Sequence, residues 1–232
     1  MSESDPRVAR GLESQLRVWR QELARGERRV GWKIGLNVPA VQEQLGIRSP
    51  VIGFLTSATE LEPGAPHSLE GGTAVGVEAE VAVHIGSDVA AGVSPAQARD
   101  AIAALGAAIE LVDIDLPFED VEPILAANVF HRGFMLGPAD RDRAGGELAG
   151  VLARIDRNGQ EQASLDAAGT LGDLAQVVRL VASLLGEQGE RLESGDVIIS
   201  GSLNRILFVE AGDVVAVDFG PLGALEVSFT SG

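Results

Sequence analysis

The chain has 232 residues, of which 45% are hydrophobic, and this is long enough to bury one sizeable core. Its 18 basic and 34 acidic residues give a net charge of −16 at pH 7, which argues against the phosphate backbone of a nucleic acid as a partner. Because the chain has no cysteine, disulfides, thiolate metal sites and a cysteine nucleophile are excluded, a composition that fits a cytoplasmic protein.

The start of the chain and its apolar segments predict neither a secretion signal nor a membrane span. Residues 1–11, MSESDPRVARG, are acidic and polar, where a signal peptide would be basic and then apolar. The longest apolar stretch, residues 101–111, contains Glu110 and is much shorter than the roughly 18 residues expected of a membrane span. We therefore expect no membrane contact.

The first sixty residues predict two helices around a short strand. Asp5 and Pro6 are typical of an N-cap and a first helical position, and apolar residues recur at helical spacing to predict a helix over residues 5–26. The segment RRVGWKIGL, residues 28–36, is apolar and punctuated by glycine, which indicates a strand. A brief helix is expected over residues 37–46.

The middle of the chain predicts loops followed by two strands that flank a helix. Residues 53–76 are rich in glycine, proline and serine and are expected to form loops and short strand pieces. A strand is expected over residues 77–85, a helix over residues 94–106, and a second, buried strand over residues 107–114. Residues 118–130 are expected to be irregular or helical.

The remainder predicts five strands and one long helix. Asn158 and Gly159 are typical of a hairpin turn. The strands are expected at residues 132–137, 150–160, 193–200, 210–217 and 224–230, and the helix at residues 171–189. No long linker divides the chain, so we expect a single α+β domain of residues 1–232, in which a helical portion, residues 1–60, packs on a β-rich core, residues 70–232.

Three acidic side chains are the strongest chemical signal in the sequence. In the strand expected at residues 77–85 one face is apolar, while the other carries Glu78 and Glu80, about 7 Å apart by strand geometry. Glu110 lies in an apolar run of the next expected strand, where an acid seldom lies without a partner. Three such carboxylates would suit Mg²⁺ or Mn²⁺. The alternative is a solvated acidic face, and His84 is expected to be a neighbour rather than a ligand.

Lys33 is the next candidate functional residue. Its neighbours Trp32 and Ile34 are apolar, and partial burial would favour the neutral amine that proton transfer needs. The alternative is an ordinary surface lysine. The turn at residues 201–205, GSLNR, offers backbone amides and hydroxyls to a carboxylate, although such turns are common between strands.

The motifs RVGWKIGLN, GVEAEVAVHIG, AAIELVDID, AAN before RGFMLG, and LESGDVIISGSL occur in this order. Together they resemble the 2-keto-4-pentenoate hydratase and 4-oxalocrotonate decarboxylase branch of the fumarylacetoacetate hydrolase superfamily, over about residues 5–230. The resemblance implies an α+β fold, a mixed β-roll with peripheral helices.

The same resemblance implies a divalent cation, Mg²⁺ or Mn²⁺, and two sets of site residues. The implied metal ligands are Glu78, Glu80 and Glu110, and the implied catalytic residues are Lys33, Asn128 and Ser202. Lys33 would act as an acid or base, and Ser202 would lie near the substrate. The chain departs from the pattern at Ala127, Val129 and Phe130, where an aspartate and small residues are usual, and these changes alter the expected pocket without touching the three acids.

The resemblance implies a lyase that hydrates 2-hydroxy-2,4-dienoates in aromatic or related catabolism. A 2-oxo acid decarboxylase of the 4-oxalocrotonate type or an acylpyruvate hydrolase are the enzymatic alternatives, and an inactive metal-binding or assembly homologue is the alternative without activity. The implied partners are a small 2-oxo acid or dienoate and further copies of the chain in a homo-oligomer, and association with a paralogous enzyme of the same pathway stays open.

Overall fold

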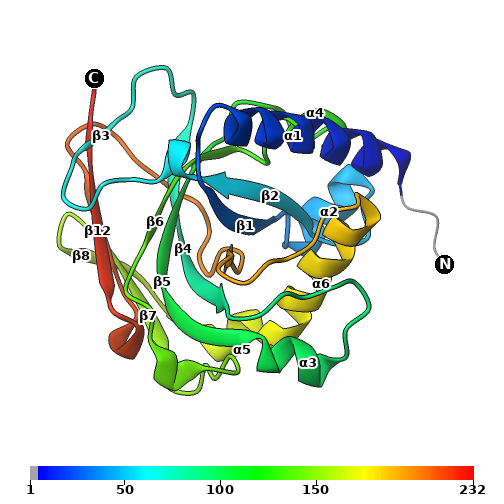
Figure 1. The fold of residues 1–232 in the computed structure, drawn as a ribbon. Coiled ribbons are helices and arrows are strands. Elements are labelled where there is room, and N and C mark those ends of the chain that lie inside the picture. Colours follow the sequence, from blue (N-terminus) through cyan, green and yellow to red (C-terminus); the bar gives the residue numbers. More distant parts are fainter. Residues whose placement is uncertain (1–4) are drawn as a thin grey trace.

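The computed structural model describes residues 5–232 as two curved sheets with helices packed on one side (Figure 1). The helices are α1 (Pro6–Ala24), α2 (Pro39–Leu45), α3 (Pro95–Asp100), α4 (Val121–Ala126), α5 (Ala167–Leu171) and α6 (Leu174–Glu187). The strands are β1 (Arg29–Gly35), β2 (Val51–Thr56), β3 (His67–Ser68), β4 (Val75–Ile85), β5 (Ile102–Asp113), β6 (His131–Leu136), β7 (Leu152–Arg157), β8 (Gln160–Asp166), β9 (Val197–Ile199), β10 (Leu207–Phe208), β11 (Val214–Asp218) and β12 (Ala224–Thr230).

The larger sheet has the strand order β2-β1-β9-β4-β5-β6, with β10 added beside β4. The smaller sheet has the order β3-β12-β11-β7-β8. Most neighbours are antiparallel, but β1 pairs with β9 and β12 pairs with β3 in parallel. The long strands β4 and β5 of the larger sheet curve through the middle of the molecule (Figure 1). The expected α+β fold with a rolled, mixed sheet is therefore confirmed.

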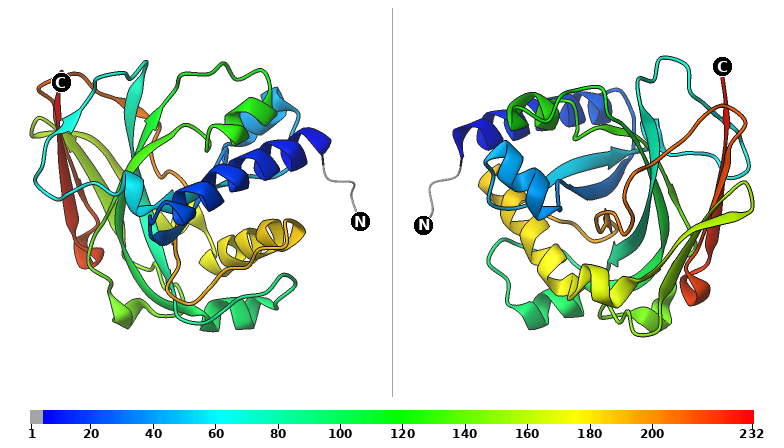
Figure 2. Two further views of the ribbon diagram at one scale, coloured as in Figure 1. Left: turned by 45° about the horizontal axis from the view of Figure 1, so that its top comes forward. Right: turned by 180° about the vertical axis from the view of Figure 1, so that it is seen from behind.

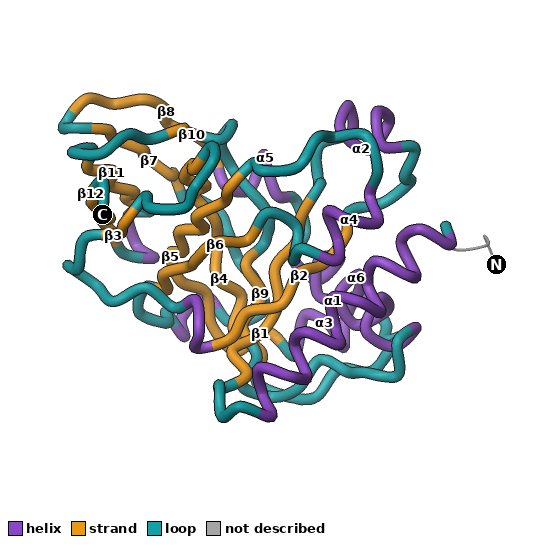
Figure 3. Tube along the Cα trace, turned by 90° about the horizontal axis from the view of Figure 1, so that it is seen from above, coloured by secondary structure: helices purple, strands orange, loops and turns teal. Residues whose placement is uncertain are grey.

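Apart from the short helix α5, which follows β8 of the small sheet, the helices gather on the side of the large sheet that faces away from the small sheet (Figure 3). The helix α1 begins as expected, because the Asp5 side chain accepts a hydrogen bond from the Arg7 amide at 2.9 Å. It lies beside α4 (Figure 2). The buried side chain of Gln15 donates to the Ile52 and Leu125 carbonyl oxygens at 3.1 and 2.9 Å, which fixes α1 to β2 and α4.

The helix expected over residues 94–106 is wrong in its second half. A capping box of Ser94 and Gln97 starts α3, but α3 ends at Asp100 and β5 already begins at Ile102. Alanine favours a helix locally, yet pairing with β4 decides the structure here. Gly106, which was expected to end the helix, instead allows close packing, because a Cβ there would lie 2.9 Å from the Pro138 carbonyl oxygen.

Two further differences concern short elements. The loops and short strand pieces expected over residues 53–76 include the end of β2 and the short strand β3, but β2 begins earlier, at Val51, and is buried along its whole length. The elements β8, α5 and β10 were not expected, although the hairpin turn between β7 and β8 was: Asn158 and Gly159 adopt φ values of 54° and 75°. Paired β-strands thus extend further than the sequence pattern indicates.

Among residues 5–232, no helix combines the length and the hydropathy that crossing a membrane requires. Residues 1–4, which open the polar segment used above to argue against a secretion signal, lie outside the described residues.

Candidate active site

The three predicted acids converge where β4 pairs with β5. Antiparallel register places Glu78 opposite Glu110, and Glu80 follows two residues later on the same face of β4. One carboxylate oxygen from each of the three lies within 4.8 Å of the other two. The side chains of Glu80 and Glu110 are fully buried, whereas Glu78 is partly exposed to a cavity. The structure therefore brings the predicted metal ligands together.

The hydrogen bonding of the acids fits a cation. Glu80 Oε2 accepts a hydrogen bond from the Gly201 amide at 2.8 Å, but Glu80 Oε1 and Glu110 Oε2 are buried without a partner among residues 5–232. A buried carboxylate oxygen without a partner is costly, and a hard divalent cation takes oxygen ligands of this kind. The donor set of three carboxylates thus suits a divalent metal ion.

The pKa values of the three acids are shifted in different directions. Loss of water and the nearby charge of Glu110 raise the pKa of Glu78 to about 7, although Lys33 and Ser202 act to lower it. Burial and both neighbouring acids raise the pKa of Glu80 well above its usual range. Burial also opposes the ionisation of Glu110, but the charge of Lys33 and a hydrogen bond from His131 keep its pKa below the usual value. Glu110 is therefore the acid of the three that ionises most readily.

Lys33 lies at the centre of the site, with a side chain that is 2% exposed. Its Nζ donates to Glu110 Oε1 and, at 2.9 Å, to the Val129 carbonyl oxygen. Gly53 lies opposite it on β2, and a Cβ at that position would meet the Lys33 side chain at 2.7 Å. Lys33 is also the single lysine of the sequence, in which the other 17 of the 18 Lys and Arg residues are arginines.

His131 joins the site although the sequence did not single it out. Its Nδ1 lies 2.7 Å from Glu110 Oε1 and its Nε2 lies 3.0 Å from the Thr59 hydroxyl. Burial lowers the pKa of His131, against the opposing effect of Glu110. The available signal was its place at the start of β6, because β6 pairs with the strand that carries Glu110.

Asn128 begins a backbone turn that places the Val129 carbonyl oxygen, and not the Asn128 side chain, against Lys33. Asn128, Val129 and Phe130 have φ values of 58°, 55° and 63°, which is uncommon for residues other than glycine. The Asn128 amide group pairs with the backbone of Phe54, accepting from its N–H at 2.8 Å and donating to its C=O at 3.0 Å. This anchor holds the Val129 carbonyl oxygen beside Lys33.

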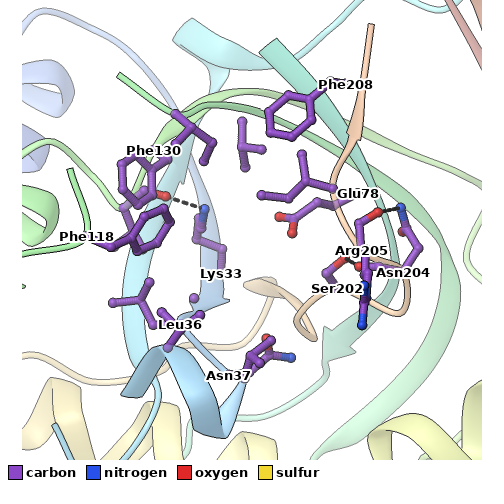
Figure 4. A pocket seen from close by; sticks show the side chains of 17 residues that line it. Lys33, Leu36, Asn37, Glu78, Phe118, Phe130, Ser202, Asn204, Arg205 and Phe208 are labelled. Carbon is purple, nitrogen blue, oxygen red and sulfur yellow. Dashed lines mark hydrogen bonds between the residues drawn. The ribbon is translucent and has the colours of Figure 1, made fainter. Parts of the chain in front are cut away.

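A cavity of about 430 Å³ lies over Lys33 and Glu78. Ser202 lines it from the turn that follows β9, and its hydroxyl donates to the Asn204 carbonyl oxygen at 2.7 Å. Figure 4 shows Ser202, Asn204 and Arg205 on the side of Glu78, and Phe118 and Phe130 on the opposite side of Lys33. A small molecule in the cavity would thus contact the lysine and one of the acids at once.

Comparison with known proteins identifies relatives along almost the whole chain. The model of the fumarylacetoacetate (FAA) hydrolase C-terminal family matches residues 31–230. A 2-hydroxyhexa-2,4-dienoate hydratase from Comamonas testosteroni is 30% identical over 93% of this chain and 83% of the relative. A 2-keto-4-pentenoate hydratase from Burkholderia vietnamiensis is 31% identical over 88% of this chain and 79% of the relative.

Solved structures agree with these matches. The 4-oxalocrotonate decarboxylase from Pseudomonas putida G7, complexed with magnesium and adipate, has a TM-score of 0.87 at 25% identity, covering 96% of this chain and 86% of that protein. A fumarylpyruvate hydrolase from Pseudomonas aeruginosa, in complex with Mn²⁺ and pyruvate, shares the fold with a TM-score of 0.68 at 17% identity, covering 88% of this chain and 89% of that protein. The chain belongs to the fumarylacetoacetate (FAA) hydrolase C-terminal family.

Proposed function

We propose that the protein is a divalent-metal-dependent lyase that hydrates 2-hydroxy-2,4-dienoates. The observation that carries this proposal is the group of three carboxylates, with two unpartnered buried oxygens, in contact with a buried lysine at the base of a cavity. The hydratases among the relatives support the substrate class.

Glu78, Glu80 and Glu110 would hold the metal ion, which we propose to be Mg²⁺ or Mn²⁺. When bound, such a cation stabilises the negative charge that develops on the oxygens of a 2-oxo acid in its enolate form. The protein contributes the fixed positions of the acids, because β4 and β5 hold them in register. The Gly201 amide orients the Glu80 carboxylate.

Lys33 is the group that we propose moves protons. In the hydration of a 2-hydroxy-2,4-dienoate, the 2-hydroxyl proton leaves and C5 gains a proton, which gives the 2-oxo-3-enoate; water then adds across the C3–C4 double bond, its hydroxyl group to C4 and its other proton to C3. The amine of Lys33 lines the cavity and is held in place by the Val129 carbonyl oxygen. It therefore lies where a proton can pass to a carbon of the bound substrate.

The other predicted site residues take supporting parts in this proposal. Ser202 offers its hydroxyl at the wall of the cavity beside Glu78, where a substrate carboxylate would lie. Asn128 acts through the turn that it anchors, by keeping the Val129 carbonyl oxygen against Lys33. His131 orients Glu110 through its Nδ1.

A decarboxylase acting on a 2-oxo acid of the 4-oxalocrotonate type is the second candidate. The likeness to the P. putida decarboxylase, with a TM-score of 0.87, favours it. Decarboxylation passes through the same kind of enolate, so the acids and the lysine serve either reaction. We also propose that the protein acts in the cytoplasm as a homo-oligomer, a state that light scattering on the purified protein tests.

The experiment that tests the proposed function compares substrates after removal and return of the metal. Protein stripped with a chelator is given Mg²⁺ or Mn²⁺ and then 2-hydroxypenta-2,4-dienoate, 4-oxalocrotonate or an acylpyruvate. We expect metal-dependent loss of the dienoate absorbance and formation of a 4-hydroxy-2-oxo acid. Release of CO₂ from 4-oxalocrotonate alone would favour the decarboxylase, and turnover of none of them would refute an enzyme of this class.

A Glu80→Ala variant tests the site itself. It should lose metal binding, followed by calorimetry, together with activity. The matched control is Glu187→Ala, which removes an exposed acid at the end of α6 and should change neither. Full activity of Glu80→Ala would contradict the proposed metal site.

A further inference from the structure

The two sides of the cavity differ in chemistry. The polar and charged lining residues Glu78, Ser202 and Arg205 lie on one side, together with the ring of Phe208 (Figure 4). On the other side the rings of Phe118 and Phe130 lie with their centroids 5.1 Å apart and their planes inclined by 43°. The apolar side is completed by aliphatic side chains that belong to the same apolar cluster as the two rings, namely Leu36, Val41, Val112 and Ile114.

The phenylalanine side of the cavity also lacks a free positive charge. Among the described residues that line it, the cationic side chains are Lys33 and Arg205. Lys33 is engaged with Glu110 and with the Val129 carbonyl oxygen, and Arg205 is exposed on the Glu78 side. A second carboxylate placed in the cavity beside the phenylalanine rings would have no cation next to it, and burial of an unpaired carboxylate is strongly unfavourable.

The size of the cavity also exceeds what the smallest dienoate needs. Its volume of about 430 Å³ lies within the range of pockets that enclose drug-sized ligands. A five-carbon dienoate whose carboxylate lies near Glu78 and Ser202 would reach past Lys33 but leave the space beside Phe118 and Phe130 unfilled. An apolar chain at the far end of the substrate would fill that space and displace water from the rings.

We propose that the substrate is a monocarboxylic 2-hydroxy-2,4-dienoate with an extended apolar substituent at the end far from its carboxylate, and that Phe118 and Phe130 select this substituent. This inference rests on the proposed hydratase function and makes it more specific. It also separates the two candidate reactions, because a distal carboxylate, which a decarboxylase of the 4-oxalocrotonate type removes, has no partner on the phenylalanine side.

Binding of unreactive analogues tests the inference without catalysis. At saturating Mg²⁺, calorimetry measures the Kd of saturated 2-oxo acids from 2-oxobutanoate to 2-oxooctanoate. We expect Kd to fall about fourfold for each methylene group that becomes buried. In Phe118→Ala the dependence on chain length should weaken, in Phe118→Leu most of it should return, and in the control Val18→Ala, an exposed position on α1, it should stay as in the wild type.

Turnover of a matched series then distinguishes the failure of this inference from the failure of the proposed function. The series consists of dienoates that carry hydrogen, ethyl, butyl, isopropyl or carboxylate at the far end. We expect the butyl compound to have the highest kcat/KM and the carboxylate compound to be at least tenfold poorer than its isopropyl isostere. Equal kcat/KM across the series would overturn the apolar selection and leave the hydratase standing.

Two other outcomes would also overturn the inference. One is a preference for the carboxylate compound that disappears in Arg205→Gln, which would show that Arg205 binds a second carboxylate. The other is turnover of no member of the series together with a Kd that does not change with the length of the 2-oxo acid. Absence of turnover with a Kd that falls with chain length would support the apolar selection and count against the hydratase alone.

Discussion

Glu110 is contacted by two basic side chains through one oxygen while its other oxygen has no partner in the described part of the chain. Lys33 and His131 both reach Oε1, and Oε2 is buried and unpartnered. The pair of contacts keeps this acid ionised in a place where burial alone would neutralise it. Oε2 is thus the atom of Glu110 that is available to a cation.

Ionisation of Glu78 predicts how the stability of the metal-free protein depends on pH. Its pKa is about 7 in the folded protein against an ordinary value of 4.5, so the unfolded chain loses the proton first as the pH rises. This contribution to stability is fully present below pH 4.5 and is lost as the pH rises through about 7. The loss is on the order of 3 kcal/mol, and denaturant unfolding at several pH values measures it.

Saturating Mg²⁺ should restore the stability that is lost at pH 8, because the cation binds the folded state. The matched variant Glu78→Gln, which cannot ionise, should show a smaller pH dependence without metal. An unfolding free energy that is independent of pH in the metal-free wild type, or an unchanged dependence in Glu78→Gln, would contradict the burial argument.

Replacement of Lys33 tests the proton-transfer role. Lys33→Met keeps the length of the side chain and removes the amine, and we expect kcat to fall about 10²- to 10⁴-fold, the usual contribution of a positioned acid or base. Calorimetry of Mg²⁺ binding checks that the acids still assemble. A variant that binds Mg²⁺ and retains wild-type kcat would exclude Lys33 as the acid or base.

The local pattern of the sequence was sufficient to find the acids and the lysine but not their neighbours. Glu78 and Glu80 share a strand face, so their proximity follows from strand geometry alone. The contacts of His131 and Asn128 depend instead on how β6 joins β5 and how the turn before β6 meets β2. Those contacts arise from tertiary pairing, which a one-dimensional pattern does not contain.

At the scale of the elements, we expect disruption of the turn that precedes β6 to lower both the unfolding free energy and kcat, two effects that can be measured separately. Asn128→Ala loses two hydrogen bonds to Phe54 and places alanine at a positive φ, so we expect a loss of about 2 kcal/mol of unfolding free energy. Because the Val129 carbonyl oxygen is no longer held beside Lys33, kcat should fall as well. Denaturant unfolding and steady-state kinetics measure the two effects.

The hairpin between β7 and β8 supplies a matched control. Asn158 also has a positive φ, and its side chain also makes two hydrogen bonds, to the Val214 amide and to Asp213. Because Asn158 is exposed whereas Asn128 is buried, Asn158→Ala should reduce stability less than Asn128→Ala does, and it should leave kcat unchanged. If both variants lowered kcat equally, the turn at Asn128 would have no particular link to Lys33.

The errors in the expected elements have a common physical cause. Residues 101–106 are rich in alanine and favour a helix locally, but they form the part of β5 that pairs with the far end of β4. Gly106 is needed there because the backbone at Pro138 approaches it closely. Likewise, the end of β2 lies in a segment whose composition indicates loops and short strands, but every residue of β2 is buried. The strand pairs with β1 and contacts the helices α1, α4 and α6. In both places tertiary packing overrides the local preference.

At the scale of the whole molecule, the expectation of a single domain predicts one cooperative unfolding transition. The two tryptophans of the sequence are Trp19 on α1 and Trp32 on β1, and their rings lie 5.2 Å apart, so fluorescence reports on the helical N-terminal portion. Far-ultraviolet circular dichroism reports on helices and strands throughout the chain, including α3 to α6 outside the N-terminal portion. We expect the two thermal transitions to coincide. A fluorescence transition at a distinctly lower temperature would indicate that the N-terminal portion unfolds as a separate unit.

The position of β9 has a consequence for the synthesis of the protein. It lies between β1 and β4, and its backbone touches β1 so closely that a Cβ on Gly31, whose φ is 153°, would lie 1.9 Å from the Val197 carbonyl oxygen. During synthesis on the ribosome, β1 and β4 therefore cannot pair with β9 until residues 197–199 have emerged. Until then each has an unpaired edge that can pair with other chains. Lys33 joins the acids of β4 and β5 only then, so a nascent chain becomes competent for catalysis near the end of its own translation.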